Sequence, residues 1–386
     1  MKFMLVAALL FTQFGSRVPL TPAETLLEPA IIKAINDEPT SATAVGVIAG
    51  VDANAGEILI TCAPDQCSIA TQAAQKLQSL IHSKRLPQPA RAIRMASAID
   101  ASTVSRARVA IHVAQSSDRP LQIIRSLWSN AGIADEVVEV LSTQYRVSVE
   151  ARPYESVGQL SLESYGVPTT TILANSTMSN QHAAFVAAAA AYFLATLPNA
   201  GAEALLSHLT VGAHARLAED GRKAVAQMGN QQRASADVLI MFGQAIEREQ
   251  RRIRSFERFV PSPVDPMLHS RIVDIEKGIT SVWTSMGLTS SPFVPAAERI
   301  RGRGGDDRRV PTRTGTGLLP RPEPPTAFLK FPNVEVVIDE LGHFIDGKRT
   351  ISDIRDAVSA EFTPIALPVV SDYFDRLAKA GAISIR

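Results

Sequence analysis

The sequence predicts an α/β domain followed by a small, mostly helical domain. Strand-like aliphatic runs and helical patterns follow one another in the N-terminal half of the chain, as in a sheet whose strands are joined by helices. Near the C-terminus, two helical patterns and a short strand pattern follow a segment rich in Arg, Gly and Pro. We therefore divide the chain into an α/β domain (17–260), a helical extension with a flexible linker (261–326) and a C-terminal domain (327–386).

The composition is that of a globular chain without a bulk charge. The 386 residues are 46% hydrophobic and 20% charged, and the formal net charge is +1. The chain is long enough for two domains, and its charge gives no overall attraction to nucleic acid or to a membrane surface. No stretch reaches the ~18 consecutive apolar residues that indicate a transmembrane helix, so no transmembrane segment is expected.

The first strand is expected within residues 56–65, Gly-Glu-Ile-Leu-Ile-Thr-Cys-Ala-Pro-Asp. Its apolar residues are β-branched or aliphatic, and Pro64 ends the pairing, which predicts a buried strand followed by a loop. A helical pattern covers 71–83. Longer helical patterns cover 183–197 and 202–260, where apolar residues recur every three or four positions.

One more helical pattern follows Pro261, and then the composition changes. The tract 247–254, Glu-Arg-Glu-Gln-Arg-Arg-Ile-Arg, mixes both charges and is expected to be a solvated helix face. Residues 298–326 hold too few apolar side chains to offset the entropy of ordering, which predicts a flexible linker. Its arginines have no aromatic neighbour on which a base can stack, so a nucleic-acid partner is not expected.

The C-terminal domain carries the clearest local signals. Residues 334–338 are a strand-like apolar run, and Asp346-Gly347 predicts a turn, because Gly accepts a positive φ. Thr350 is expected to cap a helix, with Asp353 three positions later as a variant of the capping box.

A second helix of this domain is expected to begin near Pro368, a residue tolerated in a first turn, and to place Phe374 on its apolar face. It ends at Gly381 and is followed by a short strand over 382–385. This order resembles a winged helix, although the fold alone does not establish DNA binding.

Residues 157–168, Val-Gly-Gln-Leu-Ser-Leu-Glu-Ser-Tyr-Gly-Val-Pro, keep the apolar and glycine spacing of a Ser-Asp-His-x-x-Phe-x-x-x-Gly-Ile-Pro segment. That segment belongs to the zinc aminopeptidases of metallopeptidase clan MH. The chain resembles bacterial members that carry a small C-terminal winged-helix-like domain. The resemblance covers most of the chain, rests on order and spacing, and implies a zinc-aminopeptidase-like three-layer sandwich. Gly158 and Gln159 stand where the family has Asp-His.

The resemblance also implies which functional residues of the family are replaced in this chain. In the family a strand ends in His-x-Asp, where this chain has Ala63 and Asp65. A helix then opens on Asp-Asn-x-x-Gly, where this chain has Ala-Thr-Gln-Ala-Ala at 70–74. The resemblance therefore implies that one metal ligand at the strand end and another at the helix start are absent.

Two further strands follow from the same resemblance. Residues 90–95 are similar to the family's Arg-Thr-Ile-Arg-Phe strand, and the acidic catalytic pair that follows it is replaced by Ala-Ile-Asp, which leaves Asp100. Residues 109–113 resemble the strand that delivers a metal-binding Asp, which places His112 near that position.

Asp65, Asp100 and His112 are the surviving candidates for site chemistry. A catalytic zinc needs three protein ligands and an open position for water, and a two-metal centre needs more. We therefore expect no metal and no other cofactor, with roles for these residues in a turn, in a loop and on a strand face. The function expected is that of a non-catalytic aminopeptidase-like protein, a pseudoenzyme that binds a peptide, an amino acid or a protein partner. The alternative is an enzyme of altered chemistry that uses these three residues without a two-metal centre.

Two features bear on the compartment. Cys62 and Cys67 flank the Asp65 loop, where an oxidising compartment would allow a disulfide, whereas in a cytosolic chain they are expected to be reduced. The apolar residues 3–11 after Met1-Lys2 are similar to a secretory signal, but no small-x-small pair follows closely. Residues 5–21 also resemble two strands of a protease-associated insert. We expect a cytoplasmic protein, with a secreted or periplasmic one as the alternative.

Overall fold

The computed structural model describes most of the chain from residue 27 onward. The residues it describes are 27, 29–39, 46–63, 66–97, 101–115, 121–125, 132–143, 148–151, 167–175, 177–197, 201–228, 236–259, 266–285, 305–315, 319–320, 322–331, 334–362 and 364–386. The signal-like N-terminus and residues 157–166 lie outside these ranges.

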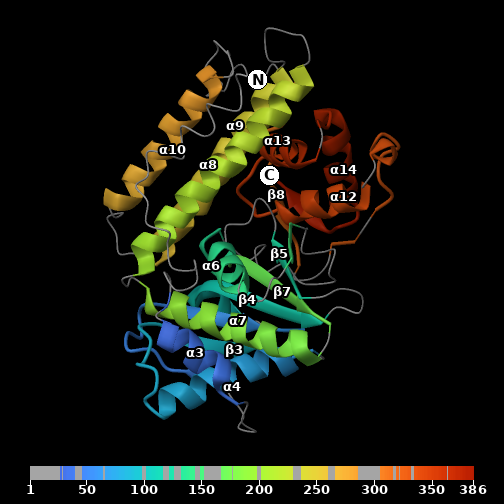
Figure 1. Cartoon of the computed structure of the whole chain (residues 1–386). Coiled ribbons are helices and arrows are strands. Elements are labelled where there is room, and N and C mark those ends of the chain that lie inside the picture. Colours follow the sequence, from blue (N-terminus) through green and yellow to red (C-terminus); the bar gives the residue numbers. More distant parts are fainter. Residues whose placement is uncertain are drawn as a thin grey trace.

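Within the described residues, a seven-stranded mixed sheet forms the centre of the N-terminal part (Figure 1). Its strands are β1 (Val47–Ile48), β2 (Glu57–Thr61), β3 (Ala92–Ala96), β4 (Ala107–Gln115), β5 (Gln122–Arg125), β6 (Ser148–Ala151) and β7 (Thr169–Ala174). They lie in the order β1-β3-β2-β4-β7-β5-β6. Strands β3, β2, β4 and β7 are parallel, whereas β1 and β5 run antiparallel to their neighbours β3 and β7.

One face of the sheet is covered by helices α3 (Pro29–Asp37), α4 (Ser68–His82), α6 (Gly132–Ser142) and α7 (Thr177–Thr196). Figure 1 shows α3, α4 and α7 side by side over the strands. Ile58 and Ile60 of β2 point into this core, as expected from the two-residue period of a strand. The alanines at 183–191 of α7 are buried, and their small side chains let the helix lie close to its neighbours.

The opposite face of the sheet carries a smaller cluster. Leu59, Ala107 and Ala110 pack there with Val167, and Val104 of α5 (Ala101–Arg106) lies against them. The α/β class is therefore confirmed, and the strands expected within 56–65, 90–95 and 109–113 are present. The finer expectation, an aminopeptidase-like sandwich, stays a prediction.

Three long helices follow the sheet: α8 (Gly201–Met228), α9 (Ala236–Arg254) and α10 (Pro266–Ser285). They pack on one another, and α9 also contacts α6 and the C-terminal helix α13 (Ile351–Glu361). A short 3-10 turn, η4 (Ser255–Arg258), ends α9. Helix α9 is thus shared between the sheet layer, the long helices and the C-terminal domain (Figure 1).

The expectation that the charged tract 247–254 is a solvated helix face is wrong for three of its charged residues. Arg248, Glu249 and Arg252 are buried. Two partners come from α8: Arg216 lies 2.8 Å from Glu249, and Asp220 lies 2.7 Å from Arg248. Two more come from α6: Asp135 and Glu136 lie 3.6 and 3.5 Å from Arg252. Burial is tolerated because each charge meets an opposite one.

The C-terminal part has a hydrophobic core of its own, which includes Leu341, Ile354 and Phe374. Its elements are β8 (Pro311–Arg313), η5 (Phe328–Lys330), α12 (Val334–His343), α13, α14 (Leu367–Lys379) and β9 (Ile383–Ile385). The capping box of Thr350 and Asp353 is confirmed. So is the stop at Gly381, which has a φ of 73°.

Two expectations for this region are wrong. The strand-like run 334–338 lies in helix α12, where it packs on α13 and η5. The linker expected over 298–326 contains strand β8, which pairs antiparallel with β9 at the other end of the domain. Val310 and Arg386 exchange backbone hydrogen bonds of 2.9 and 3.1 Å. The proposed domain boundaries otherwise stay a prediction.

None of the helices in the described ranges combines the length and apolar composition that crossing a bilayer requires.

Candidate functional site

The candidate site lies where the carboxyl ends of β2, β4 and β7 meet the start of α4. Parallel strands bring their carboxyl ends to one edge of a sheet, and ligands of open α/β sheets bind outside that edge. Ala63 and Asp65, which the resemblance aligns with the family's His-x-Asp, follow β2 in the sequence, so an aminopeptidase-like cleft at this edge stays a prediction.

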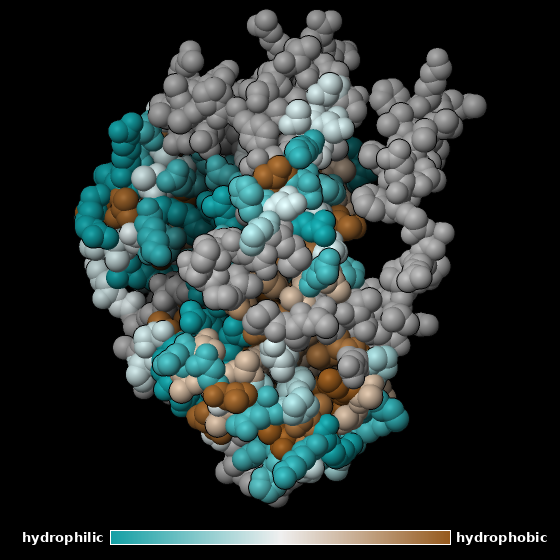
Figure 2. All heavy atoms as spheres, turned by 90° about the vertical axis from the view of Figure 1, so that its left-hand side faces the viewer, coloured by the Kyte–Doolittle hydropathy of each residue, from teal (hydrophilic) through white to brown (hydrophobic). Residues whose placement is uncertain are grey.

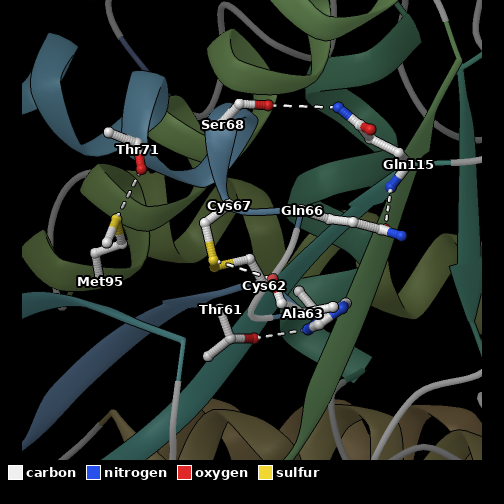
Figure 3. Close-up of a disulfide and its surroundings, with 10 residues drawn as sticks. Thr61, Cys62, Ala63, Gln66, Cys67, Ser68, Thr71, Met95 and Gln115 are labelled. Carbon is white, nitrogen blue, oxygen red and sulfur yellow. Dashed lines mark hydrogen bonds between the residues drawn. A yellow bond between two sulfur atoms is a disulfide. The ribbon is translucent and has the colours of Figure 1, made fainter.

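A disulfide joins the end of β2 to the beginning of α4 (Figure 3). Cys62 follows the strand directly, and Cys67 immediately precedes the helix. The backbone N–H of Gln66 donates to the carbonyl of Ala63 at 2.9 Å, and this turn brings the two Cα atoms to 5.1 Å. The expectation of reduced cysteines is therefore wrong and the disulfide alternative holds. The compartment stays a prediction.

Two glutamine side chains bridge this loop to the end of β4. The backbone N–H of Gln115 donates to Oε1 of Gln66 at 3.1 Å, and Nε2 of Gln115 donates to Oγ of Ser68 at 3.4 Å (Figure 3). The sequence interpretation missed both glutamines. The available signals were a polar residue directly before Cys67 and another at the last position of β4.

His112 lies on β4, on the face of the sheet turned away from α4 and α7. It is in register with Thr61 of β2 and Thr171 of β7. Its Nδ1 lies 3.0 Å from Oγ1 of Thr61, and its side chain is buried. Burial lowers the pKa of His112 to about 4, so the imidazole is neutral at neutral pH.

Nε2 of His112 and Oγ1 of the neighbouring Thr171 are buried and have no hydrogen-bond partner among the described residues. Burying a polar atom without a hydrogen-bond partner lowers the stability of the folded state, so these two atoms are destabilising where they lie. The predicted strand-face position of His112 is confirmed, and its side chain is more deeply buried than the half-buried Ala63, Gln66 and Cys67 at the carboxyl edge.

The other two predicted site residues, Asp65 and Asp100, lie outside the described residues, as do Gly158 and Gln159, which stand in place of the family's Asp-His. In the ranges that the structure describes, no group of three His, Cys, Asp or Glu side chains is arranged to hold a metal ion. The absence of a metal centre therefore stays a prediction, because Asp65 and Asp100 are not among the described residues.

The charged groups of the sheet that the structure describes gather toward its other end. Glu57 begins β2, and its carboxylate lies 2.6 Å from Arg94 and 2.7 Å from Arg106. The arginines hold the pKa of Glu57 below its usual range, with the hydrogen bond from Arg94 as the largest cause. The described side chains at the carboxyl edge are, by contrast, neutral amides, hydroxyls and a disulfide.

No protein-family model matches the sequence, and no curated protein matches it. The resemblance to zinc aminopeptidases rests on residue spacing, and family membership stays a prediction.

Proposed function

We propose that this chain is a non-catalytic, aminopeptidase-like protein that binds a peptide, an amino acid or a protein partner at the carboxyl edge of its sheet. One observation carries the proposal: the described groups at this edge are neutral, and a disulfide joins the end of β2 to the start of α4 beside them. Amide and hydroxyl groups of Gln66, Ser68 and Gln115 donate and accept hydrogen bonds, as peptide groups require. Neutral amides do not act as a general base at neutral pH.

The state of His112 supports the same function. A general base works best when its pKa is near the working pH. A pKa of about 4 makes the buried imidazole a weak base at neutral pH. His112 is also hydrogen-bonded to Thr61 within the sheet, which is a structural role.

The test combines metal analysis, activity and binding on the purified protein. We expect no stoichiometric zinc and no turnover on a panel of amino-acyl substrates. Calorimetric titration with a peptide panel is expected to identify a binder. Gln66→Ala is expected to weaken its affinity about tenfold, which is the effect of losing roughly 1.4 kcal/mol. The matched control is Gln88→Ala, an exposed glutamine in the loop before β3.

Stoichiometric zinc together with turnover abolished by Asp65→Ala would contradict this function. The altered-chemistry alternative is favoured by one observation: the buried Nε2 of His112 has no hydrogen-bond partner in the part of the chain that the structure describes. Zinc-independent turnover that is lost in His112→Asn and in Asp100→Asn would establish that alternative.

A further inference from the structure

We propose that the Cys62–Cys67 disulfide is a reversible thiol-exchange site, at which a small external thiolate attacks Sγ of Cys67. The bond lies at the edge of the sheet, between the end of β2 and the first residue of α4 (Figure 3). The proposal concerns the chemistry of the two sulfur atoms and does not depend on the ligand proposed above.

The two cysteines differ in exposure. Cys62 is 5% exposed and belongs to the main hydrophobic core. Cys67 is half-buried and lies at the border of that core, next to the exposed Ser68. A thiolate must reach the sulfur that it attacks, so access directs the exchange to Cys67.

The position of Cys67 also favours its release as a thiolate when a mixed disulfide on Cys67 is resolved, because a better-stabilised thiolate is the faster leaving group. Cys67 immediately precedes α4, a helix of 15 residues. Its first turn has no acidic residue, and no side chain caps its start. The N–H groups and the dipole at a helix N-terminus stabilise negative charge and lower the pKa of a cysteine placed there. The same field attracts an approaching thiolate to this sulfur.

The reduced state is accommodated by the same surroundings. Sγ of Cys67 lies 3.1 Å from the carbonyl oxygen of Ala63. A reduced Cys67 thiol can donate to this oxygen, whereas the disulfide sulfur has no hydrogen to donate. A reduced Cys62 is a small apolar residue and can remain in the core that it already occupies. Neither redox state requires a new partner for the sulfur atoms.

The exchange balances with a monothiol as the reductant. The external thiolate forms a bond to Sγ of Cys67, the bond between Cys62 and Cys67 breaks, and Cys62 leaves as a thiolate that takes a proton from solvent. A second thiolate then attacks the external sulfur of the mixed disulfide. Cys67 is released and protonated, the protein gains two electrons, and two thiols become one disulfide.

The experiment uses the full-length protein, reduced and oxidised glutathione as the probe, rapid alkylation, and peptide mapping by mass spectrometry. In the native protein we expect reduction without loss of the circular dichroism spectrum, with the mixed disulfide located on Cys67. Cys62→Ser removes the leaving thiol and is expected to trap the glutathione adduct on Cys67. Cys67→Ser is the matched control, in which Cys62 is expected to react at least tenfold more slowly.

Three results would overturn the proposal: a bond that is reduced only when the protein unfolds, an adduct on Cys62, or equal reaction rates for the two variants. If a variant fails to fold, peptide mapping of the native protein decides the question alone.

Discussion

Gly132, the first residue of α6, lies directly against Arg252 of α9. A Cβ built on Gly132 would lie 2.6 Å from the Cα of Arg252, which is closer than real Cβ contacts. The backbone N–H of Ile133 donates to Oγ of Ser255 at 2.9 Å, which fixes the same end of α6. The layer of helices on the sheet and the long helices are therefore joined by a close backbone approach together with buried charges.

Gly132→Ala is expected to lower the free energy of unfolding by about 1–3 kcal/mol, because the added methyl group must push the two helices apart. Urea denaturation followed by circular dichroism measures the change. The matched control is Gly243→Ala in α9, where a Cβ meets no atom within 4 Å. This control is expected to be stabilising by about 0.5–1 kcal/mol, because Ala has the higher helix propensity. Equal effects of the two substitutions would contradict the close approach.

His112 is expected to make the stability of the protein depend on pH. Its pKa falls from 6.5 to about 4 on folding, so the unfolded chain binds the proton more tightly. The stabilising contribution is complete above pH 6.5 and is lost as the pH falls toward 4. Its size is on the order of 3 kcal/mol.

The measurement is the free energy of unfolding at pH 7.5 and at pH 5 for the parent protein and for His112→Asn. The variant is expected to lose less stability between the two pH values. His82→Asn, at an exposed position, is the control and is expected to behave as the parent does. A parent and a His112→Asn variant with the same pH dependence would refute the prediction.

Glu361, at the end of α13, is expected to act in the opposite direction. Its Oε2 is buried. Burial, followed by the neighbouring carboxylate of Glu340, raises the pKa of Glu361 well above 4.5, and Arg248 of α9 offsets only part of this. The folded chain then binds the proton more tightly, so the stabilising contribution is complete below pH 4.5 and decreases as the pH rises above it.

Glu361→Gln reproduces the neutral form and is expected to raise the melting temperature at pH 7, with a smaller gain at pH 4.5. Thermal unfolding at the two pH values tests this. Glu335→Gln, at an exposed position on α12, is the control. A melting temperature at pH 7 that is unchanged or lower in Glu361→Gln would show that the carboxylate is charged in the folded protein.

The sequence predicted elements whose signals are local. The strand in 56–65 follows from its own β-branched and aliphatic residues. The helix beginning at Thr350 follows from a capping box only three residues apart. Gly381 ends α14 because of its own backbone conformation.

The errors arose where a distant partner decides the outcome. Strand β8 looks like a linker because its partner β9 lies about seventy positions later in the chain. The sequence around Arg252 suggests an exposed side chain, because its partners Asp135 and Glu136 are more than a hundred positions away in the chain. The run 334–338 has an apolar content that suits a strand or a helix, and packing against α13 selects the helix.

The candidate site was predictable in place but not in detail. The carboxyl end of β2 follows from the strand predicted within 56–65, and the strand that carries His112, β4, follows from the resemblance. The disulfide depends on a turn that returns Cys67 to Cys62, and the Gln66–Gln115 bridge depends on the register of β4 beside β2. The five-residue separation of the cysteines allows the disulfide without deciding it, and nothing in the sequence pairs Gln66 with Gln115.

The C-terminal domain is expected to fold on its own when it begins at residue 305 rather than at 327. Fragment 305–386 retains β8 and its pairing with β9, and it keeps Arg309 within 2.6 Å of Asp375 and Ser371 within 2.7 Å of Asp307. Fragment 327–386 lacks these contacts and is expected to be less stable. Both fragments are small, so stability of a few kcal/mol is expected for the longer one.

Phe374→Ala is expected to unfold fragment 305–386, because the ring is fully buried and its removal costs ~3 kcal/mol or more. Leu329→Ala, at a residue that is 63% exposed, is the control and is expected to change little. In the full chain the α/β domain is expected to stay folded in Phe374→Ala, because its core is separate. Circular dichroism melting of both fragments and of the variants is the measurement. If fragment 327–386 were as stable as fragment 305–386, β8 would not be needed for folding. If the Phe374→Ala fragment were as stable as its parent, the ring would not belong to the core.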